Sequence, residues 1–194
     1  SFQFMSSSLS QLVEDLRSGG LDKFKYTSQE FGVLTEKMIR KGVFPYTYMD
    51  NWDKFNVDPR ILKREDFKND LNNENISESD FKFFHEVCEQ FCIKNLGEYC
   101  DIYLRSDICL LADVFECFRK TCREYYSLDP CHYFTAPGLS WDACLKMTGV
   151  ELELISDNDM HQFIEKGVRG GVSIITKRKG DANNNYMKNY DSTK

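Results

Sequence analysis

The sequence predicts a helix-rich α/β fold. Most of the 194 residues lie in segments whose apolar residues recur at helical spacing, or whose ends carry helix-capping residues. One late segment, residues 169–176, instead alternates with β-branched residues and predicts a strand. Hydrophobic residues make up 41% of the chain and aromatic residues 14%, which is enough apolar surface to form a core and argues against a disordered chain.

The N-terminal part of the chain is expected to form two helices and a long irregular connection. A short helix is predicted over residues 8–16, closed by two glycines. The capping box that starts at Thr27 predicts a second helix over residues 28–41. Aromatic residues around a proline between positions 44 and 55 indicate an extended, partly buried stretch. Residues 58–75 are charged and polar, which indicates an exposed connection with little core.

Four more helices are predicted from their terminal signals. Ser77 or Ser79 caps a helix that reaches about residue 91, and Asn95 with Glu98 caps a long helix that reaches about residue 126. Pro130 interrupts the pattern because proline cannot donate a backbone hydrogen bond. The last two helices are expected over residues 139–148, after Pro137-Gly138, and from Asp157 to about residue 167.

The charge balance bears on possible partners. The formal net charge is −6. A free-standing nucleic-acid binder usually carries a basic surface, because phosphates attract lysine and arginine. The overall charge therefore argues against DNA binding by this chain alone, and the basic run Lys177-Arg178-Lys179 is too short to reverse it.

The eight cysteines fall in predicted helices rather than in the short loops of a disulfide scaffold. They indicate reduced thiols and an intracellular protein, and the cysteines leave open whether its place is the nucleus or a viral replication site. No stretch approaches ~18 apolar residues, so no membrane span is expected. No leader segment is visible and the chain opens at Ser1 without Met, so we expect a piece of a longer protein.

The long predicted helix carries a carboxylate on its apolar half. At about 100° per residue, Asp107 falls among apolar side chains, whereas Asp113 falls on the polar side. An ionised carboxylate on an apolar face is unfavourable unless a cation or hydrogen-bond donors meet it. Asp107 is therefore expected to pair with a basic residue of another element, to lie at a cleft edge, or to bind a metal ion beside Tyr103. The apolar half contains Tyr103, Leu104, Ile108, Leu110, Leu111, Val114, Phe115 and Phe118.

Packing is the favoured interpretation of several other reactive side chains. His85, Cys88 and Cys92 share one helix face. A zinc site there would need a fourth ligand from elsewhere, whereas a free cysteine commonly packs as a small apolar residue. Trp52 and Trp141 are interpreted as core anchors.

Four short motifs occur in an order that is typical of one enzyme family. Tyr103-Leu104-Arg105-Ser106-Asp107 resembles the third exonuclease motif of family B DNA polymerases. Lys41-Gly42-Val43-Phe44, followed by Tyr46, resembles a Lys-x-x-hydrophobic motif of their protein-primed branch. Ser1–Met5 resembles a Ser/Thr-Leu-x-x-hydrophobic motif with Phe2 in place of Leu, and Arg169-Gly170-Gly171 resembles a Tyr-x-Gly-Gly motif with Val168 in place of Tyr. Residues 41–46 and 132–142 also resemble the polymerases of Maverick/Polinton-type elements and related viruses.

The resemblance implies a role for each matching residue. Asp107 would hold a metal ion, Tyr103 would orient the attacking water, and Lys41 would contact the scissile phosphate. Ser1, Phe2 and Tyr46 would hold the frayed primer end, with aromatic faces stacking on bases. The Arg-Gly-Gly motif would approach template phosphates. The implied DNA-binding residues are Ser1, Phe2, Tyr46, Arg169, Gly170 and Gly171.

The resemblance also implies the parent protein. Residues 1–126 would be the C-terminal part of an RNase H-like 3′–5′ exonuclease domain, and residues 127–194 a connector toward the polymerase palm. The parent would be a DNA-directed DNA polymerase, a nucleotidyltransferase that extends a primer-template with dNTPs, proofreads, and starts from a terminal priming protein. Mg²⁺ is the expected ion at both sites. The first two exonuclease motifs and the palm motifs are expected outside the chain, so the isolated chain is expected to be inactive.

Two other functions stay open. A domesticated, non-catalytic helical interaction module would suit the acidic charge and the missing motifs, and a stand-alone nuclease would need only the upstream motifs. The flanking sequence separates these hypotheses. An Asp-x-Glu motif upstream and an Asp-x-x-x-Leu-Tyr motif downstream would favour the polymerase.

Overall fold

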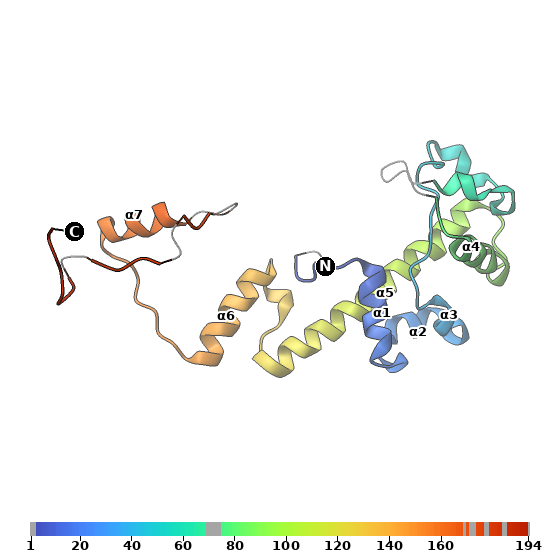
Figure 1. Ribbon diagram of the computed structural model, residues 1–194. Helices are drawn as coiled ribbons and strands as arrows, with labels where there is room; N and C mark the ends of the chain where they lie inside the picture. The colour runs from blue at the N-terminus through green and yellow to red at the C-terminus, as the bar shows by residue number, and fades with distance from the viewer. Residues whose placement is uncertain are drawn as a thin grey trace. The chain divides into compact units, whose positions relative to one another are not determined.

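The computed structural model describes residues 3–68, 75–168, 170, 174–176, 179–183 and 186–193. Over these residues the chain forms helices and short 3-10 turns, and no strand (Figure 1). The helix-rich prediction is therefore confirmed, while the predicted strand over 169–176 is absent from its described residues, Gly170 and 174–176. The α-helices are α1 (Leu9–Ser18), α2 (Lys25–Phe31), α3 (Thr35–Met38), α4 (Glu78–Gln90), α5 (Leu96–Tyr126), α6 (Ala136–Thr148) and α7 (Asn158–Gly167).

The chain divides into two compact units, Ser1–Val150 and Glu151–Lys194. The first unit contains α1 to α6, joined by the 3-10 turns η1 (Leu21–Lys23) to η6 (Pro130–His132). The second unit contains α7, which Asp157 caps by accepting a hydrogen bond from the Met160 backbone at 2.7 Å. The division reflects only which residues contact one another. The predicted boundary between an exonuclease part, residues 1–126, and a connector, residues 127–194, stays a prediction.

Helix α5 is the central element of the first unit, and both apolar clusters form on it. One cluster joins α4 to the first half of α5 through buried side chains such as Phe84, Leu96 and Tyr99. The other joins α1 and the residues that flank α2 and α3 to Leu110 and Val114 of α5. Figure 1 shows α1 and α2 lying against this part of α5.

The predicted apolar half of α5 is corrected by the structure. Leu104, Ile108 and Leu111 are exposed, whereas Asp113, placed on the polar side by the helical wheel, is only 1% exposed. The cause is that the covering elements change along the helix, with α4 over its first turns and α1 and α2 farther on. A single stripe therefore does not describe which residues of α5 are buried.

Most helix starts follow their predicted caps. Ser77 accepts a hydrogen bond from the backbone of Asp80, and Asn95 accepts one from the backbone of Glu98. The capping box at Thr27 is wrong, because α2 begins at Lys25 and the Thr27 side chain points into the core instead. The helix predicted over 28–41 is also interrupted at Gly32, whose φ of 51° is left-handed.

Two further predictions are wrong for reasons of packing. The connection over 58–75 was expected to lack a core, but its short turns η4 (Pro59–Ile61) and η5 (Arg64–Phe67) bury Leu62 and Phe67. Trp52 and Trp141 were expected in the core, but they are 84% and 59% exposed.

The eight cysteines form no disulfide bond with one another, and their reduced state in the cell stays a prediction. Among the described residues, no helix has the length and apolar character needed to span a bilayer.

Candidate functional site

The segment that follows α3, residues 41–46, packs against α5 through hydrogen bonds and ring contacts. Tyr99 of α5 donates a hydrogen bond from its hydroxyl to the backbone carbonyl of Val43. Gly42 lies so close to the Tyr103 ring that a Cβ at this position would stand 3.1 Å from a ring carbon. A side chain at this position would require the Tyr103 ring or the segment to shift by a few tenths of an ångström, so glycine allows this close contact.

Arg40 fixes the segment from its other side. Its guanidinium forms an ion pair with Asp80 at the start of α4 and lies 4.5 Å above the centre of the Phe83 ring. Both contacts involve the residue immediately before Lys41. The backbone that carries Lys41 is therefore held between α4 and α5.

Aromatic rings line the contact between this segment and α5. The Phe44 ring lies 5.1 Å from the Tyr46 ring and 5.3 Å from the Tyr103 ring. The hydroxyl oxygens of Tyr46 and Tyr103 are 2.8 Å apart and share a hydrogen bond. The rest of the Tyr46 ring is open to solvent, because that residue is 67% exposed. One tyrosine is thus buried and its partner presents a free aromatic face.

Asp107 lies one helical turn after Tyr103 and is half-buried. Its Oδ1 atom is buried and has no hydrogen-bond partner among the described residues. Burial raises the pKa of the Asp107 carboxyl, while the charge of Lys41 and the hydroxyl of Tyr103 lower it by less. The carboxylate is thus held in a place that disfavours its charge, with one nearby ammonium to offset it.

The phenol of Tyr103 stays protonated at neutral pH. Burial raises its pKa most, and the hydrogen bond with Tyr46 and the charge of Asp107 raise it further. A neutral phenol beside a carboxylate can donate a hydrogen bond to a water molecule or to an oxygen anion. Tyr103 is therefore a hydrogen-bond donor rather than a base.

The structure brings four of the predicted site residues together. Lys41, Tyr46, Tyr103 and Asp107 come from two segments far apart in sequence and meet at one face of α5. We call these four residues the Asp107 cluster. Gly170 is exposed in the second unit, which is described separately from the first. The other predicted contacts, Ser1, Phe2, Arg169 and Gly171, lie outside the described residues.

The donor set bears on the metal ion that the resemblance implies. An orphaned, half-buried carboxylate oxygen fits a hard cation such as Mg²⁺, which prefers oxygen ligands. Asp107 can supply one such ligand, but no group of three His, Cys, Asp or Glu side chains gathers in the described part of the chain. Residues from elsewhere would have to complete the coordination of an ion.

Two of the three alternative zinc ligands are packed, whereas Cys92 is exposed and lies beyond the end of α4, so the three do not share one helix face as predicted. The His85 ring lies 4.6 Å from the Phe81 ring, and Cys88 is buried. Burial raises the pKa of the Cys88 thiol to about 12, so the thiolate that zinc requires is disfavoured. The packing interpretation is consistent with these contacts for His85 and Cys88.

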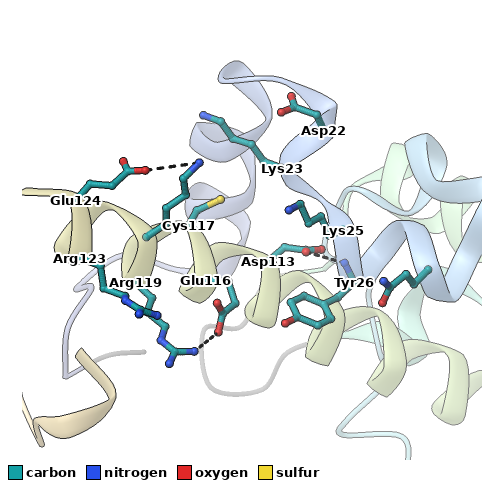
Figure 2. Close-up of a pocket in the computed structure, with 12 residues that line it drawn as sticks. Asp22, Lys23, Lys25, Tyr26, Asp113, Glu116, Cys117, Arg119, Arg123 and Glu124 are labelled. Atoms are coloured by element: carbon teal, nitrogen blue, oxygen red, sulfur yellow. Dashed lines mark hydrogen bonds and ion pairs between the residues drawn. The ribbon is translucent and has the colours of Figure 1, made fainter. Parts of the chain in front are cut away.

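Asp113 is a residue that the sequence pattern misplaced. Its carboxylate accepts a hydrogen bond from the Tyr26 backbone at 2.8 Å (Figure 2). It also accepts hydrogen bonds from the Thr27 backbone at 3.0 Å and from the Thr27 hydroxyl at 2.7 Å. Helix α2 has no capping side chain of its own. Asp113 caps it from α5 and so anchors the helix that leads to Lys41.

Comparison with known proteins places these observations in one family. A family model described as DNA polymerase type B, organellar and viral, matches residues 3–191. No curated protein and no solved structure matches the chain. The matched range contains all four residues of the Asp107 cluster and extends over nearly the whole chain.

Proposed function

This chain belongs to the organellar and viral type B DNA polymerase family, and we propose that it forms part of a DNA-directed DNA polymerase in which the Asp107 cluster serves 3′–5′ proofreading. One observation carries this proposal. A half-buried carboxylate oxygen without a hydrogen-bond partner lies beside a neutral phenol and within the field of one lysine. Such an arrangement is unfavourable for folding and useful for binding a cation and a phosphate.

We assign each side chain of the cluster a role in hydrolysis of the primer's terminal phosphodiester. Asp107 would be one ligand of Mg²⁺, which when bound activates water and offsets negative charge on phosphate oxygens. The Tyr103 phenol donates a hydrogen bond to the attacking water and so orients it. The Lys41 ammonium offsets the charge that develops on the phosphate. The exposed face of Tyr46 stacks on the base at the primer end.

The remaining parts of the proposal concern the parent protein. We propose that residues 1–126 complete an RNase H-like exonuclease domain and that residues 127–194 lead toward the palm. Template DNA and dNTPs are the expected substrates of such an enzyme. A terminal protein would prime synthesis if the enzyme follows the protein-primed branch. One carboxylate supplies too few ligands to hold the two ions of such a site, so we expect the isolated chain to hydrolyse no DNA at a useful rate.

The test uses the complete polymerase that carries this chain and a primer-template with a mismatched 3′ end. Asp107→Asn should lower excision of the mismatched nucleotide by on the order of 100-fold, because it removes a charge that stabilises the transition state. Extension of a matched primer should stay unchanged, which shows that the protein is folded. The matched control is Asp101→Asn, an exposed carboxylate of the same helix, and it should leave both rates unchanged.

Excision at the wild-type rate by Asp107→Asn would contradict the proposal. A polymerase that neither excises nor extends DNA in its wild-type form would instead favour the non-catalytic interaction module. Lys41→Ala sharpens the assignment, because it should lower excision by about tenfold while the mismatched primer still binds. Loss of primer binding in that variant would assign Lys41 to DNA binding alone.

A further inference from the structure

The first unit carries a second hollow surface, away from the Asp107 cluster. A pocket of about 660 Å³ lies between the turn that leads into α2 and the second half of α5 (Figure 2). Five basic residues line it, although the chain as a whole is acidic. They are Lys23, Lys25, Arg119, Lys120 and Arg123.

The acidic residues in this pocket neutralise only some of the basic ones. Glu116 pairs with Arg119 at 3.0 Å, and Glu124 pairs with Lys120 at 3.7 Å. Asp22 also lines the pocket, and the Asp113 carboxylate at its floor is occupied by hydrogen bonds from α2.

The remaining cations are open to a ligand. Neither Lys23 nor Lys25 forms an ion pair with any residue that the structure describes. Arg123 is 62% exposed and approaches Asp129 only at 4.0 Å. Arg119 is bound more closely by the same carboxylate, at 2.7 Å. These three basic side chains outnumber the Asp22 carboxylate, so the pocket keeps a net positive charge toward an anion.

Tyr26 adds an aromatic surface to these charges. Its side chain lines the pocket and is 44% exposed, and its backbone N–H is fixed by Asp113 at 2.8 Å. Phe24 is buried in the core, so Tyr26 is the ring of this run that a base can reach, and Lys23 and Lys25 beside it suit phosphates. A simple anion would use the charges and leave the ring unused.

A second hollow extends the surface beyond this pocket. Arg123 also lines an adjoining hollow, which continues past the end of α5 to His132 and Tyr133. A bound strand could therefore pass from Lys23 and Lys25 along α5 toward Tyr133. A free mononucleotide would fill only one end of this surface.

We propose that this surface binds single-stranded DNA, with Lys23, Lys25 and Arg123 on backbone phosphates and Tyr26 stacked on a base. The residues of α5 that line the site run from Asp113 to Glu124 and so lie about 9 to 26 Å along the helix from Asp107, since a helix rises about 1.5 Å per residue. DNA is chosen as the ligand on the family membership of the chain. The site itself does not depend on the role of the Asp107 cluster in excision.

The test measures binding of a fluorescent single-stranded oligodeoxynucleotide of about 12 nucleotides to the whole chain, by anisotropy at several salt concentrations. The triple variant Lys23→Ala, Lys25→Ala, Arg123→Ala should weaken binding by tenfold or more. The slope of log affinity against log salt should flatten by about 2, because each lost contact to a single strand removes roughly 0.7 from it. Tyr26→Ala should weaken binding about tenfold without changing the slope, and Tyr26→Phe should bind as wild type.

The controls separate binding at this pocket from a general effect of charge or of unfolding. Lys82→Ala with Lys94→Ala removes two exposed charges that do not line the pocket, and it should bind as wild type. Far-ultraviolet circular dichroism shows whether each variant keeps its helices. Wild-type affinity in a folded triple variant would overturn the proposal, as would equal affinity and salt slope for polyglutamate. If a deoxynucleoside monophosphate binds with the same affinity as the oligonucleotide, the proposal that an extended strand occupies the surface is overturned.

The outcome is independent of the excision test. If Asp107→Asn abolishes excision while the triple variant binds DNA normally, only the second site fails. If the triple variant loses binding while Asp107→Asn still excises, only the assignment of the Asp107 cluster fails.

Discussion

Two aspartates of α5 lie six residues apart and are held in opposite ways. Asp113 is almost fully buried and accepts three hydrogen bonds from the start of α2. Asp107 is half-buried, and its buried oxygen accepts none from the described residues. The Asp113 carboxylate therefore stabilises the folded chain, whereas the buried charge of Asp107 is expected to lower its stability.

The contrast separates a structural carboxylate from a candidate functional one. Both residues are aspartates on one helix, so neither residue type nor secondary structure distinguishes them. The difference comes from which backbone donors other elements bring to each side chain. A carboxylate whose one buried oxygen has no hydrogen-bond partner among the described residues, near a lysine and a phenol, can bind something that is not part of this chain.

The largest expected effect on stability comes from replacing Asp113, the aspartate whose hydrogen bonds are made within the chain. Asp113→Ala should lower the free energy of unfolding by about 3 kcal/mol, because two backbone N–H groups and the Thr27 hydroxyl lose their buried acceptor. Urea denaturation at neutral pH measures this loss. A change of about 0.5 kcal/mol, as at an ordinary surface position, would show that α2 does not depend on this cap.

A smaller effect tests how the segment before Tyr46 is held near Asp107. Tyr99→Phe removes the hydroxyl that donates to the Val43 carbonyl and should lower the free energy of unfolding by about 1 kcal/mol. The freed segment would also carry Lys41 away from Asp107, so the pKa of Asp107 should rise further. Unfolding in urea and a carboxyl titration check the two results. An unchanged pKa would mean that Lys41 is placed by Arg40 and α4 alone.

The smallest effect has the opposite sign and concerns Asp107 itself. Asp107→Asn should raise the free energy of unfolding by on the order of 1 kcal/mol at neutral pH, a modest gain because solvent reaches this half-buried carboxylate. Asp101→Asn is the control and should change stability little, because that carboxylate is exposed. A clear loss of stability in Asp107→Asn would mean that the carboxylate has a stabilising partner.

The gain from Asp107→Asn should depend on pH in a defined direction. The folded pKa of Asp107 is raised above its ordinary value of 3.8, so the folded chain holds the proton more tightly than the unfolded chain. Wild-type stability therefore falls, relative to the variant, as pH rises from below 3.8 through the raised value. Urea denaturation at several pH values measures this difference, which should vanish at the acidic end.

Features set by neighbouring residues could be predicted from the sequence. The caps at Ser77, Asn95 and Asp157 need only a side-chain oxygen and a backbone N–H three residues on. The Asp107 cluster was also predicted, because its motifs are short and contiguous. The structure adds that these motifs meet in space.

Features set by distant contacts could not be predicted in the same way. The capping box at Thr27 fails because the hydroxyl binds Asp113, which lies 86 residues away. The helical wheel misplaced Asp113 because it assumes one buried stripe, whereas different helices cover different parts of α5. Trp52 stacks on Phe55 at 5.6 Å and stays exposed, and nothing in its local sequence distinguishes this from burial.

The most direct test of the contrast is a titration of the Asp107 carboxyl carbon by nuclear magnetic resonance, in the wild-type chain and in Lys41→Ala. The wild-type midpoint should lie above the ordinary value of 3.8, because burial outweighs the two favourable neighbours. The Lys41→Ala midpoint should lie higher still, because the one nearby ammonium is gone. A wild-type midpoint at or below 3.8 would contradict the account, since it would mean that Asp107 is already satisfied within this chain.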